Sequence, residues 1–332
     1  MKAAQINGYS KEIELKWNDI PKPNVQDYDV LVKVKAAGVN PLDMLILRGN
    51  VKQIVDYKFP LTMGNELSGV VEAVGKRVTK FKEGDSIYTR LPEKQIGAFA
   101  EYAVVNEDAI AKMPTNLTYV EAAAVPLTAL TAYQALKEKF NAKPNEKIFI
   151  SGGTGGLGAM AVPMAKYFGL YVITNGGETG RERMLDLGAD EFFNYKSEDY
   201  SERLSNIDYV LDTLGAKEIE KELGILKPYG KLVSLAGMPN YRFAMERQFP
   251  FLKKMMFRMA GSSLDKMALK QNKEYHFLFM RADGKQLEQI TKFVESENIK
   301  PSIDSIFESK DINTALKKVD TGHSKGKVIL TF

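Results

Sequence analysis

Three glycines carry the clearest chemical signal in the sequence. Gly153, Gly155 and Gly158 have the spacing GxGxxG, directly after an apolar run and directly before a helical stretch. Glycines at this spacing close a tight turn, let the backbone approach a pyrophosphate and let the next helix direct its N–H groups at the phosphates. The segment predicts a dinucleotide site, and the alternative is a merely structural turn. The predicted pyrophosphate contacts are Ser151, Gly153, Thr154, Gly155, Gly156 and Leu157.

The end of the next apolar run indicates which dinucleotide binds. This run ends in Thr174 and Asn175, so no carboxylate at its tip would bind a ribose 2′-hydroxyl and repel a 2′-phosphate. Glu178 lies near the expected spacing but follows two further glycines. Because Thr174, Asn175 and Arg181 offer donors to a phosphate, we favour NADP(H) over NAD(H). The alternative is that Arg181 and Arg183 belong to a solvated helix face.

The residue types that are absent narrow the possible chemistry. The 332 residues include no cysteine and only two histidines, His276 and His323. Disulfides, thiolate zinc sites, iron–sulfur ligation and cysteine nucleophiles are therefore excluded. A net charge of +4 gives little support for a nucleic-acid or membrane partner, and no apolar run is long enough to span a bilayer. We expect a cytoplasmic protein that acts on a small molecule.

The glycine-rich segment lies within a longer alternation of strands and helices. Four apolar runs, separated by helical stretches, predict a parallel sheet with right-handed crossovers. Residues 1–118 differ, since they contain short alternating runs broken by turn signals. Thr118 and Glu121 form a capping-box pattern where the character of the sequence changes. The four apolar runs are residues 147–151, 171–174, 209–212 and 231–236, and a final helix and strand lie within residues 286–332.

Five stretches resemble the medium-chain dehydrogenase/reductase superfamily, and the resemblance runs nearly from end to end. The resemblance implies an α/β protein with three parts: a GroES-like β-rich catalytic domain at 1–118, a Rossmann NADP(H)-binding domain with a doubly wound parallel sheet at 119–284, and residues 285–332 returning to complete the catalytic domain. The matching stretches are residues 36–43, 64–69, 126–133, 208–215 and 322–328.

Two positions separate this chain from the zinc alcohol dehydrogenases of that superfamily. Asn40 stands where the first zinc cysteine would be, and Asn65 replaces the zinc histidine. The sequence instead resembles the zinc-free quinone oxidoreductase and enone (alkenal) reductase branch, and we expect no bound metal. That resemblance implies transfer of a hydride from NADPH to a quinone or to the β-carbon of an α,β-unsaturated carbonyl compound. The protein would then need to align the reactants and stabilise charge on the carbonyl oxygen.

The resemblance also assigns roles to single residues. Asn40 would contact substrate or nicotinamide, with a loop-capping role as the alternative, and Asp43 would have a structural or cofactor-orienting role in the active site. Tyr195 and Arg181 would hold the 2′-phosphate. Asp212 is expected to cap a loop, and Tyr57 and Tyr88 would form walls of the site. The residues expected to line the nicotinamide and ribose are Thr131, Leu214, Ala236 and Gly237.

Other interpretations stay open. The chain could be an NADPH-binding sensor or scaffold with little turnover, or a metal-free NADP-dependent alcohol or aldehyde oxidoreductase. Residues 322–326 satisfy the hydrolase pattern GxSxG, but the strand expected after them does not fit a nucleophile elbow. Residues 251–259 could form a membrane or partner helix, although a core or substrate-covering role is commoner. The family resemblance suggests a homodimer joined along an edge strand, with residues 275–280 as the candidate, although a buried strand within one subunit would show the same pattern.

Overall fold

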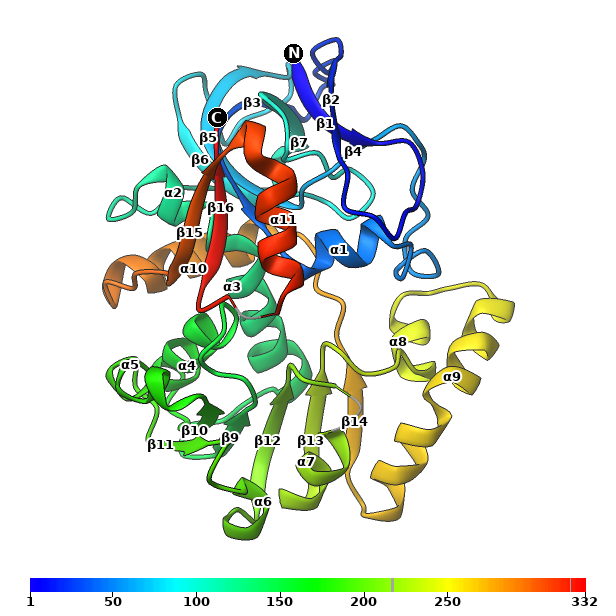
Figure 1. Cartoon of the computed structure of the whole chain (residues 1–332), viewed down its shortest axis with the longest axis vertical. Helices are drawn as coiled ribbons and strands as arrows, with labels where there is room; N and C mark the ends of the chain where they lie inside the picture. Colours follow the sequence, from blue (N-terminus) through cyan, green and yellow to red (C-terminus); the bar gives the residue numbers. More distant parts are fainter. Residues whose placement is uncertain (216–217, 323) are drawn as a thin grey trace. The chain divides into compact units, whose positions relative to one another are not determined.

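The chain forms two compact units, which we call unit 1 and unit 2 (Figure 1). Unit 1 comprises Met1–Leu130 and Arg281–Phe332, and unit 2 comprises Thr131–Met280. The C-terminal segment thus belongs to the same unit as the N-terminal segment. The computed structural model describes residues 1–215, 218–322 and 324–332.

Unit 1 is built around the long strand β3 (Asp29–Val39), whose alternating apolar side chains are largely buried. Its described strands form a seven-stranded sheet in the order β15-β16-β3-β5-β6-β8, with β7 also paired to β3. A second, three-stranded sheet has the order β2-β1-β4. The other strands are β1 (Lys2–Ile6), β2 (Lys16–Asp19), β4 (Leu61–Thr62), β5 (Glu66–Val74), β6 (Ser86–Arg90), β7 (Tyr102–Asn106), β8 (Ile110–Lys112), β15 (Ile303–Glu308) and β16 (Lys327–Thr331).

The helices of unit 1 explain where the chain passes into unit 2. Thr118 and Glu121 form the predicted capping box, which begins α2 (Tyr119–Ala122). Because α2 packs on β3 and β5, the chain stays with unit 1 until Leu130, twelve residues beyond the boundary predicted at residue 118. The predicted helix after residue 286 is α10, and its apolar side chains Leu287, Ile290, Phe293 and Val294 are buried. The remaining α-helices are α1 (Pro41–Leu47), α10 (Gly284–Ser296) and α11 (Ile312–Asp320), and α3 (Pro126–Tyr133) begins in this unit.

Unit 2 contains the predicted parallel sheet. Its described strands have the order β11-β10-β9-β12-β13-β14, and every neighbouring pair is parallel. The order reverses direction at β9, where α/β sheets of this type bind ligands. The strands are β9 (Lys147–Ile150), β10 (Tyr171–Gly176), β11 (Glu191–Asn194), β12 (Ile207–Asp212), β13 (Leu226–Ser234) and β14 (Glu274–Phe277). The helices are η2 (Gln134–Phe140), α4 (Gly158–Tyr167), α5 (Arg181–Asp186), α6 (Tyr200–Arg203), α7 (Ile219–Ile225), α8 (Tyr241–Glu246) and α9 (Phe251–Lys270).

The predicted elements of the sheets are present, but some of their ends differ. β7 begins only at Tyr102, because Phe99 and Ala100 just before it pair with β1 instead. β13 begins at Leu226, five residues before the predicted start, since Leu226 already pairs with β12. Long-range pairing, which no local pattern reports, set both of these ends.

Candidate active site

Five polar side chains gather inside unit 1, and we call them the buried polar cluster. Asn40 and Asp43 lie where β3 passes into α1, Asn65 and Glu66 lie at the start of β5, and Lys327 begins β16. All five are at most 5% exposed. They meet because β3 pairs antiparallel with β5 on one side and with β16 on the other.

The amide of Asn40 is committed to other members of this cluster. Its Nδ2 donates to Glu66 Oε1 at 2.8 Å and to Gly38 O at 3.2 Å, and its Oδ1 accepts from Lys327 Nζ. Lys327 Nζ also bonds Glu66 Oε1 at 2.5 Å. Both donors and the acceptor of this amide therefore have protein partners, so the structure supports a structural role for Asn40 over the predicted contact with substrate.

Asp43 is fully buried and has two partners. Its Oδ2 accepts from the backbone N–H of Asn40 at 2.7 Å, and its Oδ1 accepts from Asn65 Nδ2 at 2.7 Å. Burial raises the pKa of Asp43 to about 7, against the lowering effect of these two hydrogen bonds. Asp43 also completes a capping box at the start of α1, which fits the predicted structural role.

The sequence did not single out Glu66 and Lys327. Glu66 Oε2 accepts from the backbone N–H of Leu127 at 2.7 Å and so caps the beginning of α3. Lys327 lies 261 residues from Glu66 along the chain. Both residues lie in stretches that resemble the family. That resemblance was the signal from which they could have been identified as functional residues. Their pairing depends on the sheet and has no local pattern.

The two predicted wall residues of unit 1 are also buried. Tyr57 is 7% exposed, and burial raises its pKa. Tyr88 is fully buried, and its hydroxyl contacts Leu287 O and Thr291 Oγ1 of α10. Packing against α10 therefore explains Tyr88 without a role toward substrate.

The glycine-rich turn in unit 2 has the geometry that its spacing predicts. A Cβ atom on Gly153 would lie 1.9 Å from Thr174 Oγ1, and one on Gly158 would lie 2.2 Å from Gly153 O. Packing alone therefore requires both of these glycines. A Cβ atom on Gly155 would meet only Gly152 O, at 3.3 Å, so the surrounding protein leaves that side of Gly155 open. A ligand that lies against the backbone explains a glycine at this position, and the turn fits a dinucleotide pyrophosphate.

Thr174 and Asn175 hold this turn in place. Thr174 Oγ1 donates to Ile150 O at 2.7 Å, and Asn175 Oδ1 accepts from the backbone N–H of Gly152 at 2.8 Å. The backbone N–H of Gly153 donates to Asn175 O at 2.9 Å. These bonds correct the expectation that both side chains are available to a 2′-phosphate, because each is buried and bonded to the protein.

The residues predicted to bind the 2′-phosphate differ in how exposed they are and in whether protein groups already bond them. Tyr195 is 61% exposed, and its ring lies near the position of a Cβ on Gly177. Arg181 Nε bonds Glu178 Oε1 at 2.8 Å, and a terminal nitrogen bonds Glu198 Oε2 at 3.0 Å, so a phosphate would have to share this guanidinium with two carboxylates. Arg183 donates to Thr154 O at 2.5 Å, which places its guanidinium at the glycine-rich turn.

Asp212 organises the two loops that follow β12 and β13. Its Oδ1 accepts from the backbone N–H groups of Leu214 and Gly215, each at 2.8 Å. Its Oδ2 accepts from Ser234 Oγ at 2.5 Å, and Ser234 Oγ in turn accepts from the backbone N–H of Gly237 at 2.7 Å. Leu214 and Ala236 are exposed on these loops. The predicted nicotinamide-side residues are thus held by one buried carboxylate, which fits the loop-capping role expected for Asp212.

Two further predicted cofactor residues, Ser151 and Thr131, are buried in unit 2. Ser151 Oγ accepts from the backbone N–H of Thr213 at 3.1 Å, so it joins the end of β9 to the loop after β12. Glu222 of α7 lies near Ser151 and is fully buried, and neither of its carboxyl oxygens has a hydrogen-bond partner. Burial and the nearby charge of Asp212 raise the pKa of Glu222 well above its usual value.

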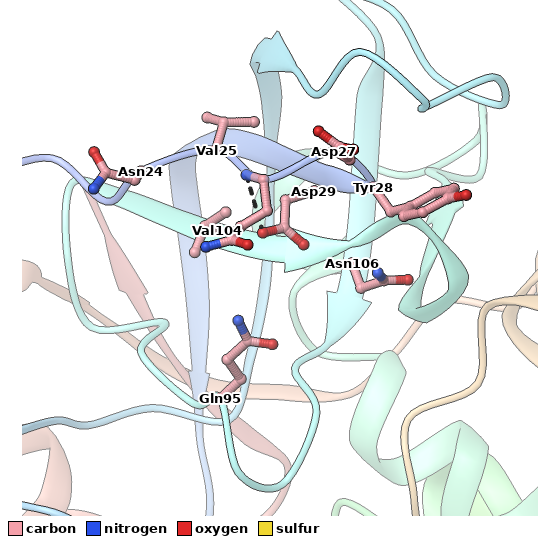
Figure 2. Close-up of a pocket in the computed structure, with 9 residues that line it drawn as sticks. Asn24, Val25, Asp27, Tyr28, Asp29, Gln95, Val104 and Asn106 are labelled. Carbon is pink, nitrogen blue, oxygen red and sulfur yellow. Dashed lines mark hydrogen bonds between the residues drawn. The ribbon is translucent and has the colours of Figure 1, made fainter.

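A polar hollow of about 780 Å³ lies elsewhere in unit 1 (Figure 2). Its lining includes no predicted site residue, and one of its carboxylates, Asp29, accepts a hydrogen bond from the backbone N–H of Gln26. The lining residues are Asn24, Val25, Gln26, Asp27, Tyr28, Asp29, Gln95, Val104 and Asn106.

Three remaining points concern metals, membranes and the GxSxG segment. In the described ranges no group of three or more His, Cys, Asp or Glu side chains could hold a metal ion. Among the same residues no helix is long and apolar enough to cross a membrane. His323 lies outside the described residues, and the segment leads into the strand β16, whereas a nucleophile elbow leads into a helix.

Two family models match the chain: an alcohol dehydrogenase GroES-like domain over residues 26–115 and a zinc-binding dehydrogenase over residues 187–330. A 2-methylene-furan-3-one reductase of Solanum lycopersicum is 30% identical over 344 aligned positions, which cover 99% of this chain and 79% of that protein. A chloroplastic NADPH-dependent alkenal/one oxidoreductase of Arabidopsis thaliana is 28% identical, with 99% and 79% covered.

A solved structure shares the whole fold. The quinone oxidoreductase from Coxiella burnetii has a TM-score of 0.85 at 26% identity, covering 100% of this chain and 99% of that chain. These comparisons confirm the resemblance of the sequence motifs. The chain belongs to the medium-chain dehydrogenase/reductase superfamily, in its zinc-free quinone oxidoreductase and enone reductase branch.

Proposed function

We propose that this oxidoreductase uses NADPH to reduce a quinone or the C=C bond of an α,β-unsaturated carbonyl compound, without zinc. The observation that carries the proposal is the glycine-rich turn, where packing requires Gly153 and Gly158 but leaves the space beside Gly155 open. The relatives' names support the same chemistry, since they describe reductases of quinones and of alkenals or alkenones.

The cofactor would lie along the C-terminal ends of the strands of unit 2. The turn and the N-terminus of α4 would hold the pyrophosphate, and the Asp212-anchored loops would hold the nicotinamide side. The tip of β10 has no acidic side chain, and exposed Tyr195 lies beside it, which favours NADP(H). Arg181 would contribute if the 2′-phosphate displaced Glu178 or Glu198 from its guanidinium.

The protein's part in the reaction would be binding and alignment. NADPH, when bound, supplies the hydride, and a quinone or enone is already electrophilic, so no metal is needed to activate it. Asp212 would fix the two loops that line the nicotinamide, and the exposed Leu214 and Ala236 would exclude water there. The sequence has no cysteine for a thiolate zinc site, and the amides of Asn40 and Asn65 are bonded within the buried polar cluster.

The first experiment follows the absorbance of the reduced nicotinamide with purified protein. We expect a quinone or an enal to oxidise NADPH and a saturated aldehyde not to oxidise it. A chelator should not change the rate. Loss of activity with chelator, restored by added zinc, would contradict the zinc-free mechanism.

One observation favours a second candidate function. Asn40, Asp43 and Tyr88 are all buried and bonded to protein groups, so none of them stands free as an acid in unit 1. A protein that binds NADPH as a sensor, with little turnover, has no need of such a group. Tight NADPH binding with no oxidation by any acceptor of the panel would support this alternative.

We also propose a homodimer that forms through β14, in a cytoplasmic protein. β14 lies at the end of the unit 2 sheet and pairs with β13 on one side. An edge strand of this kind can pair with a second copy. Light scattering at several protein concentrations tests it, and a Tyr275→Pro variant, which lacks a backbone N–H in β14, should shift the population toward monomer.

A further inference from the structure

The first half of α9 presents large apolar side chains to solvent. Phe251, Leu252 and Met259 are 70%, 81% and 77% exposed, whereas Phe257 and Gly261 are buried. At about 100° per residue, positions 251, 252, 255 and 259 fall within about 100° of the helix circumference, opposite the buried side. We call Phe251, Leu252, Met255 and Met259 the α9 face. Apolar side chains gathered in this way mark a contact surface more often than scattered ones do.

Helix α8 packs on α9 (Figure 1). Tyr241 and Met245 of α8 are 37% and 45% exposed. Both helices also contact β14. The surface therefore has a rigid base and does not belong to a free loop.

Basic residues surround the α9 face and acidic residues are absent from it. Lys253, Lys254 and Arg258 lie within residues 251–264, a stretch that contains no aspartate or glutamate. The next acid, Asp265, accepts a hydrogen bond from Asn240 Nδ2 at 2.7 Å. In the described part of the chain these three cations have no ion pair, and Lys253 and Arg258 lie over the rings of Phe249 and Tyr241. The whole-chain charge of +4 conceals this local concentration and gave little support for a membrane partner, although a membrane helix at residues 251–259 stayed open as an alternative.

The three cations beside the α9 face favour one of two possible binding partners, a second copy of the chain or an anionic lipid surface. A second copy whose own α9 face lay against this one would set three cations against three cations. An anionic lipid surface instead attracts the cations and accepts the apolar side chains at its acyl boundary. We infer that the α9 face docks the protein on an anionic phospholipid membrane surface. The inference does not depend on the proposed reaction.

Co-sedimentation of the full chain with vesicles tests the inference. Vesicles of phosphatidylcholine alone are compared with vesicles that also contain phosphatidylserine, at low and high salt. We expect binding to the anionic vesicles only, weakened by salt. The double variant Lys253→Gln, Lys254→Gln should bind on the order of 25-fold more weakly, at about fivefold for each charge removed. Leu252→Glu should reduce binding by at least about tenfold, because a charged side chain cannot enter the acyl boundary.

Ile306→Glu is the matched control, since Ile306 is a large apolar residue, 56% exposed, on β15 of unit 1 and not on α9. It should bind anionic vesicles like the original protein, and all variants should keep the same NADPH affinity and melting temperature. The inference is overturned if the original protein does not bind anionic vesicles, or if Leu252→Glu and Ile306→Glu behave alike. If Leu252→Glu leaves vesicle binding intact but changes the mass in solution, the occupant is a second copy instead.

Discussion

The buried polar side chains of the two units have different hydrogen-bond partners. In unit 1, Asn40, Asp43 and Lys327 are buried and bonded to one another or to Glu66. In unit 2, the polar residues Asp212 and Asn175 are also buried, but they bond to backbone N–H groups of loops whose outer residues stay exposed. Unit 1 thus builds a closed cluster, while unit 2 builds open loops on a fixed base. Open loops with a fixed base are what a cofactor site requires.

The difference between the two units bears on which residues contact the cofactor or substrate. Family resemblance directed attention to Asn40 and Asp43, yet both serve the architecture of unit 1. Gly155 and the loops anchored by Asp212 are better placed to contact a cofactor. Substitutions in unit 1 should therefore change mainly stability, and substitutions in unit 2 should change mainly binding.

Removal of Lys327 should have the largest effect. Lys327→Met leaves Glu66 as an unpaired buried charge, so the free energy of unfolding should fall by about 3–5 kcal/mol. Urea denaturation measures this loss. Lys2→Met is the control, because the pair of Lys2 with Asp19 is exposed and screened by solvent, so its loss should change stability little. Equal losses for both variants would show that the buried polar cluster does not stabilise unit 1.

The free energy of unfolding should depend on pH because the Asp43 carboxyl group titrates differently in the folded and unfolded protein. Its folded pKa of about 7 exceeds its unfolded value of 3.8, so its stabilising contribution is complete below the unfolded pKa and is lost as the pH rises to about 7. Between these values the original protein should lose about 1.4 kcal/mol per pH unit from this group.

Asp43→Asn should remove that part of the pH dependence. Asn65 Oδ1 has no hydrogen-bond partner, so a flipped Asn65 amide can accept from the new side chain. Urea denaturation of both proteins at several pH values gives the difference. Parallel pH profiles would mean that Asp43 is not protonated in the folded state near neutrality.

A side chain on Gly155 should block the cofactor without unfolding the protein. Gly155→Val should weaken NADPH binding by about 100-fold, the loss expected for one or two hydrogen bonds to a charged group. Gly224→Val is the control, because nothing lies within 4 Å of a Cβ atom at that position. Fluorescence titration gives the dissociation constants, and native affinity in Gly155→Val would mean that the pyrophosphate lies elsewhere.

The smallest expected effect concerns the 2′-phosphate. Arg181→Ala combined with Tyr195→Phe should raise the dissociation constant for NADPH about tenfold and leave that for NADH nearly unchanged. Arg203→Ala is the control, since Arg203 also pairs with Glu198 but is not a predicted phosphate ligand. If NADPH and NADH are affected equally, the assignment of these residues to the 2′-phosphate is wrong.

The features that could be predicted from the sequence are those that depend on residues close together in the chain. The glycine spacing located the turn between β9 and α4, and Thr118 with Glu121 located the start of α2. Apolar runs located β9, β10, β12 and β13 of the unit 2 sheet. Each of these signals lies within a few residues, where sterics and hydrogen bonding act directly.

What could not be predicted depends on residues that are distant in sequence. Lys327 and Asn40 are 287 residues apart, and Arg181 is shared with Glu198 from another segment. Thr174 looked available to a phosphate until Ile150 O was found to accept its hydroxyl proton. The types of these residues were visible, but their partners are set by the pairing of strands.

The most direct test of the central claim is the position of a deuterium label after reduction of an enal with NADPH deuterated at the transferred position. Hydride transfer to the activated alkene predicts a saturated aldehyde that carries deuterium on its β-carbon. An unsaturated alcohol with deuterium on the former carbonyl carbon would contradict the account and would identify an alcohol/aldehyde oxidoreductase.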